Sequence, residues 1–258
     1  MDLGLKNKVI IVTGAARGIG DGIVRVLSEE GAIVAIVGRG QKDNLKLQNE
    51  LEKSGGHVFS VEAELGEPAA CEKAVDTIVQ HYGRIEGLVN QAGVTDNAGL
   101  GAGNHERFME NLHMNLVHYY LMAHFAIPYL KISNGAIVNI SSKKVETGQG
   151  NTSTYAAAHG GRNALTREWA VELLKYGIRV NAVIVSESYM PQNESYLQTF
   201  KNPNEKIMEI VSENRMPKPS EIAHAVAFLL SEKSSHTTGQ LIHVGGGNVH
   251  LDRALANA

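Results

Sequence analysis

The chain has 258 residues, enough to bury a hydrophobic core in one domain, and its 43% hydrophobic and 20% charged content is typical of soluble globular proteins. A net charge of −3 favours binding neither to nucleic acid nor to an anionic membrane surface. No apolar run approaches the roughly 18 residues of a membrane span or the length of a signal sequence. The single Cys71 excludes an internal disulfide and is typical of a reducing compartment, so we expect a cytoplasmic protein.

Short runs rich in β-branched residues alternate with longer amphipathic segments along most of the chain. Strands are expected at residues 9–14, 32–38, 57–63, 85–93, 135–142, 177–185 and 240–246. Helices are expected at 18–30, 45–56, 71–82, 108–130 and 154–176. This alternation predicts an α/β fold in which residues 1–258 form a single doubly wound Rossmann domain. Its seven-stranded sheet should be mostly parallel, with helices on both faces.

The segment 186–217 interrupts this rhythm with a mixture of polar and aromatic residues. Insertions of this length that follow the carboxyl end of a strand often form lids over a site. We therefore expect a lid-like segment here.

A glycine-rich turn, TGAARGIG at residues 13–20, lies between the first strand and the first helix. Gly14, Gly18 and Gly20 allow a tight turn and a close approach of the backbone to a ligand, and the helix N-terminus favours an anion. The position of this turn in an alternating βα chain predicts binding of a dinucleotide through its diphosphate.

The end of the second strand bears on the choice of dinucleotide. Sites selective for NAD place a carboxylate there to bind the ribose 2′-hydroxyl, whereas this strand ends at Gly38 and Arg39. Arg39 and Arg17 could both bind a 2′-phosphate, so NADP is favoured over NAD. The alternative is that both arginines are solvated surface residues.

Several motifs occur together in a recognisable order: TGAARGIG, NQAG at residues 90–93, Asn115, NISS at residues 139–142, and Tyr155. Over its whole length the chain resembles the short-chain dehydrogenase/reductase family. Stretches such as SSKK and LTREWA are similar to bacterial L-fucose dehydrogenase-like members. The resemblance implies hydride transfer between nicotinamide C4 and a carbinol or carbonyl carbon.

The resemblance also implies roles for individual residues. Tyr155 would be the general base in oxidation or the acid in reduction, Ser142 would hold the substrate oxygen, and Asn115 would organise its helix and a water on the proton-relay path. The cofactor would contact Gly14, Arg17, Gly18, Ile19, Gly20, Arg39, Glu64, Leu65, Asn90, Ala92, Gly93, Tyr155, His159, Val185 and Ser188.

Several positions depart from the family pattern, and the most consequential is His159, which lies where the family has a catalytic lysine; the others are Gln91, Val185, Ser186, Met190 and Gly245. A cation about 5 Å from a phenol stabilises the phenolate by roughly 3 kcal/mol at an effective dielectric near 20. A histidine with an ordinary pKa is mostly neutral at pH 7 and would provide little of this stabilisation.

Three functional hypotheses remain open from the sequence. The first is an oxidoreductase acting on a sugar or polyol hydroxyl, with substrate contacts from Ser142, Gln149, Asn151 and Glu187. The second is a nucleotide-binding protein whose catalysis is weak or lost because of His159, and the third is an NADPH-dependent ketone reductase. The residues around Gln149 could instead form an ordinary polar surface loop.

Two further expectations concern metals and assembly. The histidine spacings match no metal-binding motif, so no metal site is expected. The family commonly assembles through the helices that contain Asn115 and Tyr155, and the resemblance therefore implies a homotetramer.

Overall fold

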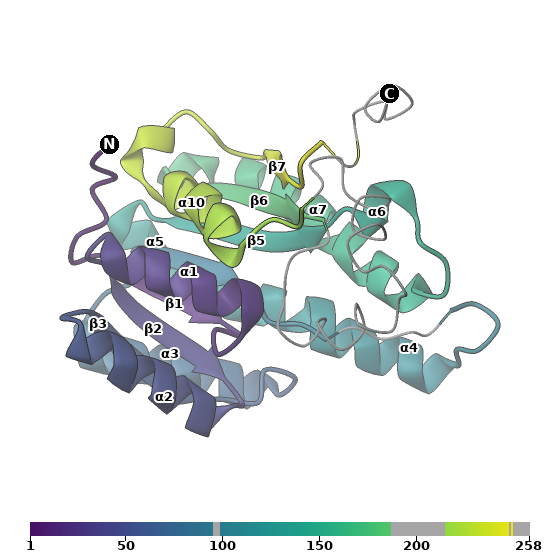
Figure 1. Ribbon diagram of the computed structural model, residues 1–258, viewed down its shortest axis with the longest axis horizontal. Coiled ribbons are helices and arrows are strands. Elements are labelled where there is room, and N and C mark those ends of the chain that lie inside the picture. Colours follow the sequence, from purple (N-terminus) through teal and green to yellow (C-terminus); the bar gives the residue numbers. More distant parts are fainter. Residues whose placement is uncertain (95–98, 187–214, 248, 250–258) are drawn as a thin grey trace.

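The computed structural model describes residues 1–94, 99–186, 215–247 and 249 (Figure 1). Seven strands form one sheet in the order β3-β2-β1-β4-β5-β6-β7. The strands are β1 (Val9–Thr13), β2 (Ile33–Gly38), β3 (His57–Glu62), β4 (Gly87–Asn90), β5 (Ala136–Ser142), β6 (Arg179–Val185) and β7 (Leu241–Val244). Every neighbouring pair is parallel, which confirms the predicted fold class.

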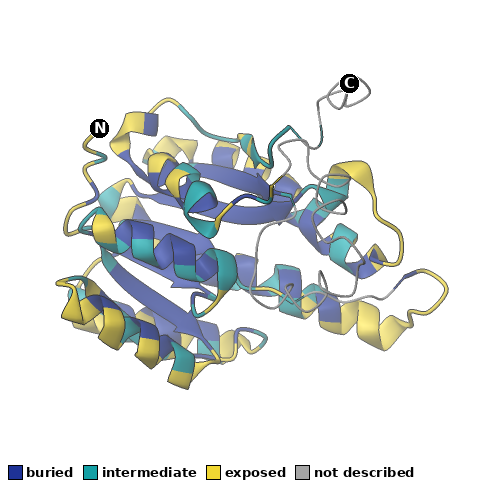
Figure 2. Cartoon of the chain, in the orientation of Figure 1, coloured by how far each residue is buried: buried dark blue, intermediate teal, exposed yellow. Residues whose placement is uncertain are grey.

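Helices cover both faces of this sheet. Successive side chains of a strand point to opposite faces, so both faces of these apolar strands are buried by helices. Ile10 and Val12 of β1 pack in one core with α1 (Gly18–Glu29), α2 (Gln41–Lys53) and α10 (Pro219–Leu230). Val9 and Ile11 pack in the other with α3 (Pro68–Tyr82), α5 (His118–Ser133) and α7 (Ser153–Glu172). Figure 2 shows the result, with buried strands between helices whose outer faces are exposed.

The carboxyl ends of all seven strands lie along one edge of the sheet, because every pairing is parallel. Asn90 is level with Asn139, and Ser142 is level with Val185. The strand order reverses direction between β1 and β4, and ligands of doubly wound sheets bind at such a reversal. The predicted glycine turn and the predicted catalytic residues therefore lie at the same edge.

The helix expected at 108–130 is divided into three parts. α4 (His105–Leu112) leads into a π-helical turn, η1 (His113–Val117), which continues into α5. A π turn inserts one extra residue into the helical hydrogen-bond pattern and often lies at a functional site. Asn115 is at the middle of this turn, so the prediction of one regular helix was wrong at the residue of most interest.

The expected helix at 154–176 also ends early. α7 stops at Glu172, and a separate short turn, η2 (Leu174–Tyr176), leads to the left-handed Gly177. A short helix not expected from the sequence, α6 (Lys144–Thr147), follows β5. Most of the lid-like segment, residues 187–214, lies outside the described residues.

Candidate active site

The glycine turn brings the backbone of two loops into close contact. Gly14 has a φ of 70°, in the left-handed region, and a Cβ placed there would lie 2.6 Å from the Cα of Ala92. A Cβ on Gly20 would meet the Gly14 carbonyl. Gly18 also has a positive φ, of 57°, at the first position of α1. Arg17 is the N-cap residue of α1, and its side chain accepts no hydrogen bond from the first turn of that helix. The first backbone N–H groups of α1 can therefore donate to a bound anion. Small residues and uncapped N–H groups together fit a dinucleotide diphosphate.

Both arginines predicted to bind a 2′-phosphate already contact a carboxylate. Arg17 Nη2 lies 2.6 Å from Asp43 Oδ2, and Arg39 Nη1 lies 3.5 Å from Glu64 Oε2. All four side chains are solvent-exposed, and exposed ion pairs contribute little stability. These guanidinium groups can therefore exchange a carboxylate for a phosphate at small cost.

Polar contacts beneath the loop that follows β4 hold it in place. Thr13 Oγ1 accepts hydrogen bonds from the backbone N–H groups of Gln91 and Ala92, at 2.9 and 3.1 Å. The Asn90 side chain points away from the loop and donates to Asn139 Oδ1 at 3.1 Å. Because Asn90 is fully buried, a cofactor contact from this residue would involve its backbone and not its amide.

Asn115 connects the π turn to the same loop. Its Oδ1 accepts a hydrogen bond from Val94 N–H at 2.9 Å, and its Nδ2 donates to Asn111 Oδ1 at 3.0 Å. Gly93 is packed so closely that a Cβ there would lie 2.7 Å from Asn115 Oδ1. Asn115 therefore holds the backbone of this loop against the π turn and the end of α4.

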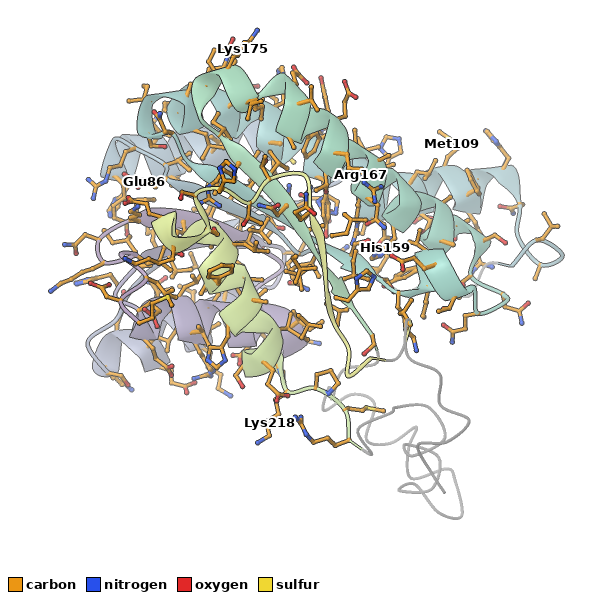
Figure 3. The ribbon with its side chains drawn as sticks, turned by 90° about the horizontal axis from the view of Figure 1, so that it is seen from above. Glu86, Met109, His159, Arg167, Lys175 and Lys218 are labelled. Carbon is orange, nitrogen blue, oxygen red and sulfur yellow. The ribbon has the colours of Figure 1, made fainter. Side chains whose placement is uncertain are left out.

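Ser142, Tyr155 and His159 come together at the carboxyl end of β5. Ser142 is the last residue of that strand, and Tyr155 and His159 lie one helical turn apart near the start of α7. The rings of Tyr155 and His159 stack with centroids 3.9 Å apart and an interplanar angle of 27°. Figure 3 shows His159 projecting from α7 into the interior, where it is only 4% exposed.

The protonation behaviour of this cluster follows from burial and from two nearby positive charges. Burial raises the pKa of Tyr155, while the positive charge of Arg162 and a hydrogen bond with Ser142 act to lower it. Burial also lowers the pKa of His159 far below its usual range, and the positive charges of Arg162 and Lys144 act in the same direction. His159 is therefore neutral throughout the physiological range.

A family model described as enoyl-(acyl carrier protein) reductase matches residues 14–248, almost the whole chain. The chain belongs to the short-chain dehydrogenase/reductase family. It is accordingly an NAD(P)-dependent oxidoreductase of that family.

Relatives with different substrates resemble this family member. A 3-oxoacyl-[acyl-carrier-protein] reductase FabG from Thermotoga maritima is 36% identical over 247 residues, covering 95% of this chain and 99% of the relative. An L-fucose dehydrogenase from Mus musculus is 31% identical over 256 residues, covering 98% and 92%. The sequence therefore resembles both a mammalian L-fucose dehydrogenase and a bacterial 3-oxoacyl reductase.

Solved structures give the same assignment. A crystal structure of Cj0485 dehydrogenase superimposes with a TM-score of 0.91 at 39% identity, covering 99% of both chains. A single-residue variant of actinorhodin polyketide ketoreductase with NADPH superimposes with a TM-score of 0.88 at 27% identity, covering 95% of this chain and 98% of that one. The family fold therefore extends over nearly the whole chain.

The sequence reasoning missed Arg162 in this family member. Its guanidinium is 2% exposed and lies between the cluster and Asn115, where Nε donates to the Asn115 carbonyl at 2.6 Å. Arg162 comes seven residues after Tyr155, which is two helical turns and therefore the same helix face. That spacing was a signal present in the sequence.

The predicted substrate residues are described only in part. Gln149 and Asn151 are exposed in the loop before α7, and Asn151 packs against Gly99. Glu187 and the cofactor candidate Ser188 lie outside the described residues. In the part of the chain that the structure describes, no set of three or more His, Cys, Asp or Glu side chains could hold a metal, and no helix could span a bilayer.

Proposed function

We propose that this protein transfers a hydride between the nicotinamide of NADP and the carbon that bears a sugar or polyol hydroxyl. The observation that supports this most directly is the position of Ser142, the last residue of β5, close enough to Tyr155 on α7 to lower the pKa of the phenol, on the same sheet edge as the glycine turn. A serine and a tyrosine so placed can hold one substrate oxygen and exchange its proton.

The residues have separate roles in this proposal. The diphosphate would lie at Gly14, Gly18, Ile19 and Gly20, the adenosine near Arg39, Glu64 and Leu65, and the nicotinamide half near Ala92, Gly93 and Val185. The nicotinamide ring, when bound, accepts or donates the hydride. In the oxidative direction, Ser142 holds the substrate hydroxyl and the Tyr155 phenolate accepts its proton. In the reductive direction, the Tyr155 phenol returns that proton to the carbonyl oxygen.

We further propose that His159 stands where the family has a lysine. The neutral imidazole stacks on the Tyr155 ring and limits its rotation. It contributes no positive charge, because burial and the neighbouring cations lower its pKa. His159 therefore orients Tyr155 without assisting its ionisation electrostatically.

A substrate panel tests the proposed activity. We expect nicotinamide reduction with aldoses such as L-fucose, D-arabinose and L-galactose, because the amides of Gln149 and Asn151 lie in the exposed loop next to the cluster. Initial rates should be measured with NADP and with NAD at several pH values. Tight cofactor binding without turnover of any sugar would contradict this substrate class and favour the binding-protein hypothesis.

A ketone reductase is the second candidate. The 36% identity to a 3-oxoacyl-[acyl-carrier-protein] reductase supports it, and the chemistry uses the same Ser142–Tyr155 pair in reverse. The same preparation should be assayed with NADPH and β-keto thioesters. Oxidation of NADPH by these ketones, without turnover of sugars, would replace the first candidate with the second.

The preference for NADP is tested by changing Arg39 to serine. Loss of a charge-assisted contact with a 2′-phosphate should weaken NADP binding by about tenfold to hundredfold and leave NAD binding nearly unchanged. Dissociation constants for both dinucleotides can be measured by fluorescence titration. Arg25→Ser is the matched control, because Arg25 is a partly exposed arginine that pairs with Asp21 and Glu50 on α1 and α2. An equal loss of affinity for NADP and NAD in Arg39→Ser would show that Arg39 does not contact the 2′-phosphate.

We also propose a cytoplasmic homotetramer that assembles through α5 and α7. Tyr120, Val171 and Leu174 support this, because these apolar or aromatic side chains on or next to the two helices are 50%, 76% and 63% exposed. The molar mass in solution, measured by light scattering, tests the oligomeric state.

A further inference from the structure

Arg162 is a buried charge without a carboxylate partner. Its side chain is 2% exposed, and among the described residues no Asp or Glu pairs with it. Burying an unpaired charge is costly, and proteins ordinarily compensate it with an opposite charge. A cation kept in this state beside a candidate active site therefore requires an explanation other than stability.

Backbone oxygens and an aromatic ring hold the guanidinium in one place. Nε donates to the Asn115 carbonyl at 2.6 Å, and Nη1 donates to the Ile140 carbonyl at 3.0 Å. The Ala92 carbonyl lies 3.5 Å from Nη2, and the Tyr119 ring centroid lies 4.0 Å from Cζ. None of these neighbours neutralises the charge. Burial lowers the pKa of Arg162, but an arginine remains protonated in proteins.

His159 connects this charge to Tyr155. Arg162 Nη1 lies 3.4 Å from His159 Nδ1, and the imidazole stacks on the Tyr155 ring at 3.9 Å. A guanidinium has no acceptor, so His159 Nδ1 must accept this hydrogen bond and the imidazole proton must be on Nε2. Arg162 thereby fixes the neutral tautomer of His159. The imidazole ring of His159 lies between the Arg162 guanidinium and the Tyr155 ring.

We propose that Arg162 is the positioning residue that supplies the buried positive charge stabilising the Tyr155 phenolate, with His159 as a neutral spacer between them. The inference rests on the proposed acid–base role of Tyr155. The family pattern places one cation at position 159, which both stabilises and orients the tyrosine. In this chain two residues share these roles. Arg162 provides the charge, and His159 provides an Nε2 donor and the stacking contact.

Other groups near the phenol do not take over this role. Around Tyr155 and Arg162, the described titratable or charged groups are Lys144 on α6, His118 and Tyr119 on α5, and His159 on α7. Lys144 Nζ lies 5.0 Å from the Tyr155 ring centroid, but its side chain is partly solvated, which screens its charge. Burial, with Arg162 as a further cause, lowers the pKa of His118 to about 3, and burial raises the pKa of Tyr119 beyond its usual range, so neither is charged near neutral pH. Arg162 is the unscreened cation of this set.

The test replaces Arg162 with methionine and, separately, with lysine. Arg162→Met keeps an unbranched apolar stem and removes the charge, whereas Arg162→Lys keeps the charge. Arg179→Met is the matched control, because Arg179 also donates to backbone carbonyls, those of Leu229, Leu230 and Ser231, and lies at the opposite end of the strands. Two readouts are needed: the pH profile of kcat/KM, and the near-ultraviolet tyrosinate titration of each protein minus that of its Tyr155→Phe counterpart.

We expect Arg162→Met to move the titration of Tyr155 to higher pH by about one to two units and to lower the rate near neutral pH by about tenfold to hundredfold. The sign follows from the charge: the guanidinium favours the phenolate, so removing it raises the pKa of Tyr155. Raising the pH should restore much of the rate lost in Arg162→Met. Arg162→Lys should retain most of the wild-type rate near neutral pH. Arg179→Met should lose stability without a shift in the pH profile of kcat/KM or in the tyrosinate titration.

The difference titration does not need turnover, so it separates this inference from the proposed function. Absence of turnover in wild type together with a shifted Tyr155 titration in Arg162→Met would contradict the proposed function. It would still support the inference that the Arg162 charge stabilises the Tyr155 phenolate. An unshifted titration in Arg162→Met would overturn the inference even if the enzyme is active. If Arg162→Met does not fold, the Arg162→Lys variant tests the inference. A Tyr155 titration like that of wild type would support stabilisation of the phenolate by a positive charge at position 162, and a titration shifted to higher pH would contradict it.

Discussion

Replacing Tyr155 with phenylalanine is expected to lower kcat by about 10²–10⁴-fold while leaving folding and cofactor binding nearly unchanged. Positioned acid–base groups contribute rate factors of this size, and the substitution removes only the hydroxyl that would exchange the substrate proton. The phenyl ring preserves the stacking contact with His159, whose centroid lies 3.9 Å away. Measurements of kcat, the dissociation constant for NADP and the thermal midpoint distinguish these effects.

Tyr82→Phe is the control for this substitution. Tyr82 is a partly buried tyrosine on α3 that packs edge-on against Phe59, away from the carboxyl ends of β4 and β5. Removing its hydroxyl should change kcat by less than about twofold. A Tyr155→Phe enzyme that retains wild-type kcat would show that another group exchanges the proton, and the catalytic roles proposed for Tyr155 and Ser142 would then fail; the Tyr155 titration would still test the effect of the Arg162 charge.

Replacing His159 with lysine is expected to destabilise the protein instead of improving catalysis. The sequence alone leaves a gain in rate open, because the resemblance implies a lysine at this position. The structure places an arginine Nη1 3.4 Å from the His159 ring, so an ammonium there would face a buried guanidinium. Two positive charges about 4 Å apart repel by roughly 4 kcal/mol at an effective dielectric of 20. We therefore expect a loss of about 2–4 kcal/mol in the free energy of unfolding and no increase in kcat, measured by denaturant titration and initial rates.

The double substitution His159→Lys with Arg162→Met provides the decisive comparison. It removes the repulsion and leaves one cation near Tyr155, so stability and rate should both recover relative to either single variant. The non-additivity should appear as a coupling free energy of about 1–3 kcal/mol, as expected for residues in contact. His224→Lys on the exposed side of α10 serves as the control for a histidine-to-lysine change. A tenfold rate increase in His159→Lys alone, with unchanged stability, would mean that Arg162 does not already supply the charge that Tyr155 needs.

The sequence was sufficient to predict the fold and the sheet edge at which the candidate site residues lie. Apolar runs such as residues 9–14 and 135–142 have the length and β-branched content of buried parallel strands, and the structure confirms them as β1 and β5. The glycine turn could be placed for the same local reason, because positive φ angles and close contacts leave room only for glycine at Gly14. Ser142 at a strand end and Tyr155 on the next long helix follow from chain order.

The tertiary structure decided what surrounds these residues. Helical periodicity does not distinguish the π turn at Asn115 from a regular turn, and α4 and this π turn pack against α7 only in the folded chain. The carboxylate partners of Arg17 and Arg39 come from residues about 25 positions away, brought together by the pairing of β1, β2 and β3.

Local sequence therefore determined the seven strands and the approximate positions of the five expected helices, because backbone propensity and hydrophobic periodicity act over a few residues. The charge environment of Tyr155 was decided only by folding. Burial lowers the pKa of His159 and keeps it neutral, and folding places the Arg162 guanidinium among carbonyl groups from three separate elements of the fold. Electrostatic interactions depend on distance and on exclusion of water, and both are properties of the packed structure.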